Sequence, residues 1–161
     1  MSEKLKIYVQ IKKIKQHNGK EFYKATVPLN LIFEKEFNAK SLEKEISILE
    51  KDYSRLITNL KALLAKIQNK SNKDGRILLY WKFGDEIINF INHVNKKSFH
   101  IEKLTDILMH DVGASIKFIT RCERFKLLYP DIKMIDPKRS FWSYIVEFES
   151  GYLSHKNKDE Q

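Results

Sequence analysis

Residues 41–70 read SLEKEISILEKDYSRLITNLKALLAKIQNK, and their apolar residues follow a strict heptad repeat. Successive apolar residues are spaced 4, 3, 4, 3, 4, 3 and 4 apart: Leu42, Ile46, Leu49, Tyr53, Leu56, Leu60, Leu63 and Ile67. Leucine at one core position with mainly aliphatic residues at the other favours a two-stranded coiled coil. The pattern predicts a long helix, with Ser41 as its N-cap, that dimerises through these eight residues.

The same stripe also suits a long helix that packs on its own chain. Ile57 and Leu64 widen the stripe, which favours this alternative. Four unbroken heptads nevertheless exceed what a helix facing a single core usually needs, so we expect a homodimer.

The segment before this helix, residues 4–28, alternates between apolar and polar side chains, which is the period of a half-buried strand. Asn18–Gly19 supplies residues that tolerate positive φ in a tight turn, and Pro28 ends the return strand. We therefore expect a β-hairpin and a short helix within residues 1–38.

The polar segment NKSNKDG (69–75) predicts a boundary, beyond which residues 76–149 are expected to form a helical domain. Helices are predicted at 76–95, where Gly84 is a mild flaw, and at 141–149, capped by Ser140. The polar tail, residues 150–161, is predicted to be disordered. The fold class is therefore α+β and mainly α.

Residues 101–129 read IEKLTDILMHDVGASIKFITRCERFKLLY, which predicts two short helices joined by a turn at Gly113. The second has a polar stripe at helical spacing: Lys117, Thr120, Arg121 and Arg124. Its apolar residues cover much of the remaining surface and are expected to pack inward: Ile116, Phe118, Ile119, Cys122 and Phe125. This arrangement is typical of a helix-turn-helix that contacts a DNA major groove. An ordinary helical hairpin with a solvated outer face is the alternative.

If the helix binds DNA, Lys117 and Arg121 are the expected contacts to base edges. Cations around it are expected to contact phosphates: Arg124, Lys126, Lys138 and Arg139. Lysines on the hairpin predict a second contact: Lys4, Lys6, Lys12 and Lys24. These lysines equally suit the protection of an edge strand against aggregation.

The charge balance favours a polyanionic partner or an acidic protein surface, because the 161 residues have a formal net charge of +9. Residues 1–33 contain seven lysines against Glu3 and Glu21, so they contribute +5 of that charge. The single cysteine, Cys122, excludes an intrachain disulfide and a cysteine-rich zinc site. The sequence contains no apolar run as long as a membrane span, so we expect a cytoplasmic protein.

Catalytic motifs are missing from the sequence. The histidines are scattered, and Asp85–Glu86 suits a solvated helix face better than a metal site. The sequence has neither a phosphate-binding loop nor a dinucleotide-binding glycine pattern. We therefore expect no enzyme activity, no cofactor and no metal.

Three blocks of the sequence resemble a known domain: LLYWKFGDEIINFI (78–91), SIKFITRCERFKLLYP (115–130) and RSFWSYIVEF (139–148). They are similar to the N-terminal domain of the YhcG-like nuclease family, an all-α domain usually followed by a PD-(D/E)XK nuclease domain. The matching positions are Leu79, Tyr80, Trp81, Gly84, Arg121, Phe125, Tyr129, Pro130 and Trp142. The resemblance implies DNA binding by a helix-turn-helix within residues 98–149. It implies no hydrolase activity, because this chain ends where the nuclease domain would begin.

The stretch ATVPLNLIFEKEF (25–37) resembles the strand–proline–helix step of AbrB-type DNA-binding dimers, although their second pair of strands is missing. Together these features predict a homodimeric DNA-binding protein that regulates transcription. The alternative is a non-catalytic assembly or interaction subunit of a separately encoded nuclease or restriction-type complex.

Overall fold

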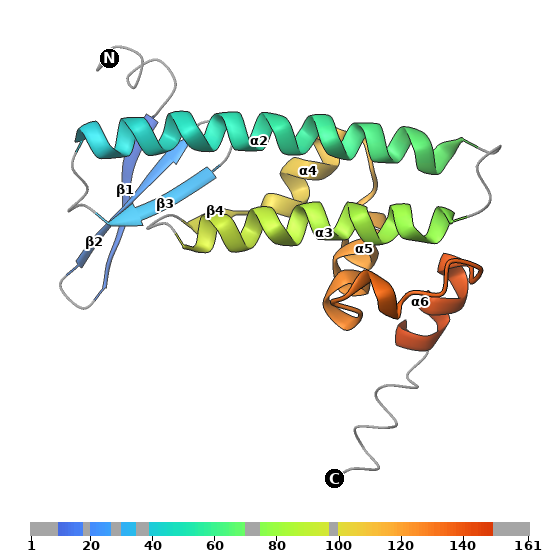
Figure 1. Cartoon of the computed structure of the whole chain (residues 1–161). Coiled ribbons are helices and arrows are strands. Elements are labelled where there is room, and N and C mark those ends of the chain that lie inside the picture. The colour runs from blue at the N-terminus through green and yellow to red at the C-terminus, as the bar shows by residue number, and fades with distance from the viewer. Residues whose placement is uncertain are drawn as a thin grey trace, which may run out of the picture. The chain divides into compact units, whose positions relative to one another are not determined.

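The structure, a computed structural model, describes residues 10–17, 20–26, 30–34, 39–69, 75–96 and 100–149 (Figure 1). The helices in these ranges are α2 (Ala39–Gln68), α3 (Arg76–Asn95), α4 (Leu104–Val112), α5 (Ile116–Leu128) and α6 (Phe141–Glu149), with a 3-10 turn η1 (Ile132–Met134). The described chain is mainly helical, which confirms the predicted predominance of α structure. Lys4, Lys6 and the tail 150–161 lie outside the described residues.

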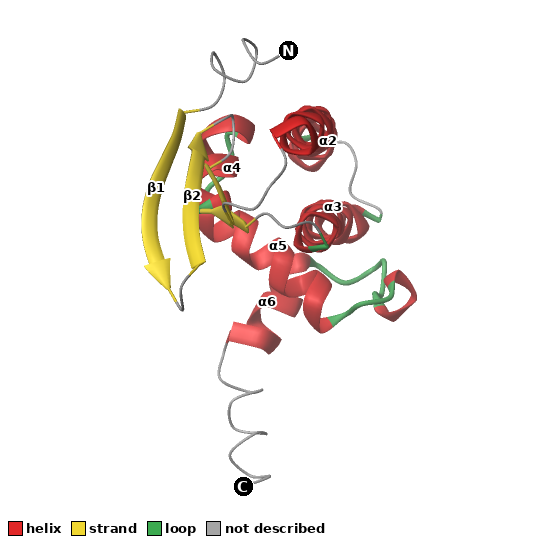
Figure 2. Cartoon of the chain, turned by 90° about the vertical axis from the view of Figure 1, so that its left-hand side faces the viewer, coloured by secondary structure: helices red, strands yellow, loops and turns green. Residues whose placement is uncertain are grey.

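Four strands form one antiparallel sheet in the order β1 (Gln10–His17), β2 (Lys20–Thr26), β3 (Asn30–Glu34) and β4 (His100–Glu102). Figure 2 shows β1 and β2 side by side. His17 lies opposite Lys20, so two residues connect these strands at the position where a tight turn was predicted. Those two residues, Asn18 and Gly19, lie outside the described ranges.

The prediction of a short helix after the hairpin is wrong for residues 30–34, which form β3. β3 is an inner strand, because its backbone pairs with β2 on one side and with β4 on the other. The residues Leu31, Ile32 and Phe33 are bulky or β-branched and favour a strand. β4 lies far along the sequence, and local patterning gave no sign that it would provide this pairing.

The chain divides into two compact units, and the division differs from the predicted domains. Unit 1 comprises residues 1–58 and 89–113, and unit 2 comprises residues 59–88 and 114–161. The polar segment 69–75 therefore does not separate the units. The division passes through the long helices α2 and α3, because each helix contributes one part to each core.

In unit 1, α2 packs through Tyr53, which is buried and lies 6.1 Å from Phe90 between ring centroids. The Tyr53 hydroxyl donates a hydrogen bond to the Asp111 carboxylate. Burial and this hydrogen bond raise the pKa of Tyr53, so the phenol remains a donor at neutral pH. His93 lies 3.3 Å from Asp52, which adds a polar contact between α2 and α3.

The predicted dimer seam is buried inside this chain. Six of its eight residues are buried in the single chain: Ile46, Leu49, Tyr53, Leu56, Leu60 and Ile67. Leu63 is partly buried, and the side chain of Leu42 lies outside the described set. The coiled-coil interpretation is therefore wrong, and the alternative of a helix packed on its own chain is correct. A heptad stripe specifies only that one face is apolar, and here the same chain covers it.

The core of unit 2 joins α3, α5, the η1 region and α6. Its buried cluster comprises Ile77, Trp81, Phe125, Ile135, Tyr144, Ile145 and Phe148. The indole N–H of Trp81 donates a 2.6 Å hydrogen bond to the carbonyl of Tyr129, just after α5. This bond satisfies the one polar atom of the Trp81 side chain and fixes the end of α5 against α3.

Gly84 determines how closely α3 and α5 approach each other. A Cβ atom at residue 84 would lie 2.6 Å from the carbonyl carbon of Cys122 and would also clash with its oxygen. Both atoms belong to the backbone, so a rotamer change cannot relieve the clash. The sequence interpretation of Gly84 as a mild flaw in the helix is wrong, because the missing side chain permits the contact.

We expect Gly84→Ala to destabilise unit 2 by about 3 kcal/mol, the upper end of the usual cost of overpacking a core. At a solvent-exposed position within a helix, the same change would stabilise the protein by about 0.5–1 kcal/mol. The sign of the measured change therefore shows whether residue 84 is closely packed. Lys82→Ala, at an exposed position of α3, is the control for a general helix effect. Chemical denaturation measures both, and a Gly84→Ala variant as stable as the wild type would contradict the close packing.

Candidate nucleic-acid interface

Helix α5 has one buried face and one polar face. Its N-cap is Ser115, whose hydroxyl accepts a 3.1 Å hydrogen bond from the backbone N–H of Phe118. Ile119, Cys122 and Phe125 are fully buried, as their spacing predicted. Ile116 was expected to pack inward but is exposed, because it lies in the first turn at the edge of the core.

The predicted polar stripe lies on the outside of α5. Lys117, Thr120 and Arg124 are exposed, and neither cation forms an ion pair within the part of unit 2 that the structure describes. α4 belongs to unit 1 and α5 to unit 2, and Gly113 ends α4 with a φ of 82°. The helices and the intervening glycine therefore match the predicted sequence positions, while their helix-turn-helix arrangement stays a prediction.

Arg121, the expected base-contacting residue, is paired with Glu149 at the end of α6. Its Nε donates to Glu149 Oε1 at 2.8 Å, and its Nη2 donates to Oε2 at 2.9 Å. This is the bidentate geometry in which a guanidinium also binds phosphate or guanine. The sequence reasoning missed Glu149, because the partners lie 28 residues apart on different helices.

The carboxylate of Glu149 contacts Arg121 and lies within the electrostatic influence of two further cations. Its pKa is lowered mainly by the hydrogen bond from Arg121 and further by the positive charges of Arg121, Lys117 and Arg124. One negative charge therefore offsets only part of the positive charge gathered on the exposed face of α5. We name the four residues Lys117, Arg121, Arg124 and Glu149 the α5 cluster.

Lys126 has a structural role. Its ammonium lies 3.1 Å from the Asp85 carboxylate, donates to the carbonyl of Pro130 at 2.7 Å and lies 4.3 Å from the centre of the Trp81 ring. The side chain is only 16% exposed. These contacts hold the end of α5 on α3, so we do not include Lys126 among the phosphate contacts.

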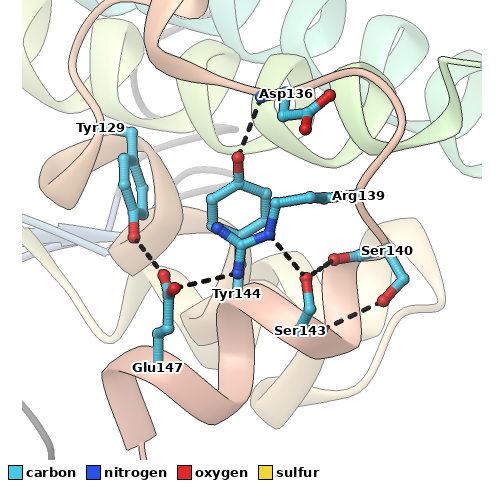
Figure 3. A network of polar contacts seen from close by, with 7 residues as sticks. All are labelled: Tyr129, Asp136, Arg139, Ser140, Ser143, Tyr144 and Glu147. Carbon is cyan, nitrogen blue, oxygen red and sulfur yellow. Dashed lines mark hydrogen bonds and ion pairs between the residues drawn. The ribbon is translucent and has the colours of Figure 1, made fainter.

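Arg139 lies in the loop before α6 (Figure 3), and Lys138 precedes it in the sequence. The Arg139 guanidinium is fixed by three neighbours: Glu147 at 3.1 Å, the Ser143 hydroxyl at 3.1 Å, and the Tyr144 ring, whose centre lies 3.9 Å away. Lys138 is exposed, and its backbone N–H donates to Asp136. The loop thus presents the guanidinium of Arg139, which is held by its neighbours, and the exposed ammonium of Lys138.

The polar network behind this loop is continuous. The Tyr129 hydroxyl donates to Glu147, and burial together with this bond raises the pKa of Tyr129 to about 12. The backbone N–H of Asp136 donates to the Tyr144 hydroxyl, and Ser140 caps α6 by accepting from the N–H of Ser143, as predicted. These bonds fix the course of the loop against α6 (Figure 3).

The sequence prediction also missed the exposed ring of Trp142, in the first turn of α6. The guanidinium of Arg121 lies 5.9 Å from the centre of this ring. Trp142 is 64% exposed, whereas the other tryptophan, Trp81, is buried. The α5 cluster therefore adjoins an accessible aromatic face.

The lysines of the β-hairpin contribute less evidence for a nucleic-acid interface. Lys12 and Lys24 lie opposite each other in the register of β1 and β2. Their side chains, like Lys4 and Lys6, are outside the described set. The single cysteine, Cys122, is fully buried, and burial raises the pKa of its thiol, which makes it unsuited to nucleophilic chemistry.

No protein-family model, curated protein or solved structure matches this chain. The resemblance to the YhcG-like and AbrB-type domains therefore stays a prediction. Within the described ranges, no group of three or more His, Cys, Asp and Glu side chains could hold a metal ion. The helices described for this chain include none long and apolar enough to cross a bilayer.

We expect Glu149→Gln to lower stability at neutral pH by about 0.5 kcal/mol, the usual size for a partly exposed ion pair. Because the folded-state pKa of Glu149 is lowered, the stabilisation is present above the unfolded value of 4.5 and is lost as the pH falls through the folded pKa. Wild type and variant should therefore converge in acid.

Thermal denaturation across pH measures this difference. The same substitution is also made in an Arg121→Gln variant, which lacks the ion pair. There, Glu149→Gln should lower the free energy of unfolding by less than it does in the wild type. An equal cost in both backgrounds would show that Glu149 stabilises the fold without Arg121.

Proposed function

We propose that this chain binds nucleic acid through the exposed face of α5, as a binding module without catalytic activity. The observation that supports it is the α5 cluster, in which Arg121 pairs with Glu149 and the positive charges of Lys117 and Arg124 act on the same carboxylate. Phosphate contacts by Lys and Arg provide most of the affinity of nucleic-acid-binding proteins. The net charge of +9 favours encounter with a polyanion.

Within this proposal, Lys117 and Arg124 contact the phosphate backbone, because both are exposed and lie seven residues apart, two turns along one face of α5. The hydroxyl of Thr120 lies between them on the same face and can donate to a phosphate oxygen. Arg121 is held in a fork geometry by Glu149, and a phosphate or guanine can take the place of that carboxylate.

DNA is the partner that the sequence pattern predicts, with α5 as the recognition helix of a helix-turn-helix and a role in transcriptional regulation. The proposal does not require dimerisation through α2, because that seam is buried in the single chain. A second candidate function is that of an interaction subunit that docks on another protein. The exposed apolar side chains of Leu127, Leu128 and Met134 favour this alternative.

We expect the double variant Lys117→Gln/Arg124→Gln to bind DNA more weakly and with less salt dependence. Each lost phosphate contact should reduce the slope of log affinity against log salt by about 0.9. Fluorescence anisotropy with labelled single-stranded and duplex DNA over a range of salt measures this slope.

The matched control is Lys51→Gln/Arg55→Gln, which removes the same two charges from exposed positions on α2. It should leave the slope near that of the wild type. No binding by the wild type at low salt would refute the proposal and favour the interaction subunit. Equal slopes for the two double variants would show that α5 is not the contact surface.

A further inference from the structure

A cavity of about 790 Å³ opens in unit 2 between the start of α3 and the loop that leads into α6. It is lined on one side by Gly75 and by Arg76, Ile77 and Tyr80 of α3, and on the other side by residues 137–142. Both segments belong to unit 2. The volume lies in the range of pockets that hold small organic ligands.

The charge of the cavity wall is positive. Arg76, Lys138 and Arg139 line it, and its lining residues include no Asp or Glu. The first turn of α6 also lines the cavity, through Phe141 and Trp142. Arg76 and Lys138, together with Arg139, which is paired with Glu147, favour an anionic group such as a phosphate.

The same cavity has an aromatic wall. Tyr80 and Phe141 stack on each other with ring centroids 4.2 Å apart and an angle of 23° between their planes. Trp142 lines the cavity with a largely exposed ring, although tryptophan is highly buried on average. An accessible indole beside cations is the combination that binds a nucleobase by stacking and its phosphate by charge.

The wall is held in place before a ligand arrives. Arg139 is fixed by Glu147, Ser143 and Tyr144, and the loop before α6 is fixed by the hydrogen bond from Asp136 to Tyr144 (Figure 3). The guanidinium of Arg76 donates to the carbonyl of Ile67, at the end of α2. Side chains that are already ordered lose little entropy on binding.

We infer that this cavity binds one unstacked nucleotide of a single-stranded nucleic acid, with its base on Trp142 and its phosphate beside Lys138 and Arg139. This inference rests on the proposed function and makes it more specific. Trp142 also lies next to Arg121 of the α5 cluster, so a strand bound along α5 can place a neighbouring base in the cavity. A paired and stacked base of a duplex presents no free face to the indole.

The test compares wild type and Trp142→Ala, as full chains, in binding to a short oligothymidylate, to a duplex of equal length and to free thymidine monophosphate. We expect Trp142→Ala to weaken single-strand binding about tenfold or more and to leave duplex binding unchanged. Trp142→Phe should retain most of the affinity, because it keeps an aromatic face.

Leu127→Ala is the matched control, because Leu127 is 63% exposed and Trp142 is 64% exposed, and Leu127 does not line the cavity. It should bind oligothymidylate like the wild type. Folding of each variant is checked by circular dichroism. Quenching of tryptophan fluorescence by oligothymidylate that occurs in the wild type and is lost in Trp142→Ala reports stacking on Trp142.

Equal single-strand affinity for wild type and Trp142→Ala would overturn the inference. If the wild type then still bound DNA with the predicted salt dependence, the proposed function would stand without it. Free thymidine monophosphate that binds as tightly as the oligonucleotide would also overturn it, in favour of a mononucleotide site. No binding of any nucleic acid at low salt would remove both proposals.

Discussion

The contact between Gly84 of α3 and the backbone of Cys122 in α5 is the constraint on which unit 2 depends. It sets α3 and α5 closer than any side chain at residue 84 would permit. On one side of this contact, Trp81 binds the carbonyl of Tyr129, and Lys126 binds Asp85. The buried face of α5 is thereby fixed, so its opposite face must lie at the surface, where the α5 cluster is found.

The surface features of unit 2 are coupled through α6. Glu149 at its end holds Arg121, and Trp142 at its start lies beside the same guanidinium. The cavity wall is in turn stabilised by the Arg139 contacts on α6. Charge and aromatic surface are therefore held by one short helix whose inner face belongs to the core. One helix of nine residues therefore positions both a cationic and an aromatic group at the surface of unit 2.

The sequence predicted local structure well where the spacing of apolar residues within one segment was enough to define a helix and its buried face. The bounds of α3 and α6 agree with the predicted segments, and the buried and exposed faces of α5 follow the spacing of Ile119, Cys122 and Phe125. The exposure of Lys117 and Arg124 was also predictable. The pairing of Arg121 and the enclosure of Lys126 were not, because each partner comes from a helix distant in sequence. Trp142 could have been suspected from the run of cations and aromatic residues at 138–142.

By itself, the sequence determined the positions of helices α3 to α6, which faces of the helices are apolar and that the chain has an excess of positive charge. Local periodicity and composition contain this information, because they depend only on near neighbours. Tertiary structure alone decided that the heptad seam of α2 is covered by the same chain, that β3 pairs with β4, and that Gly84 permits a close contact. These outcomes depend on which distant segments come into contact. An apolar stripe or an unpaired strand edge indicates that some segment must cover it, but it does not identify that segment.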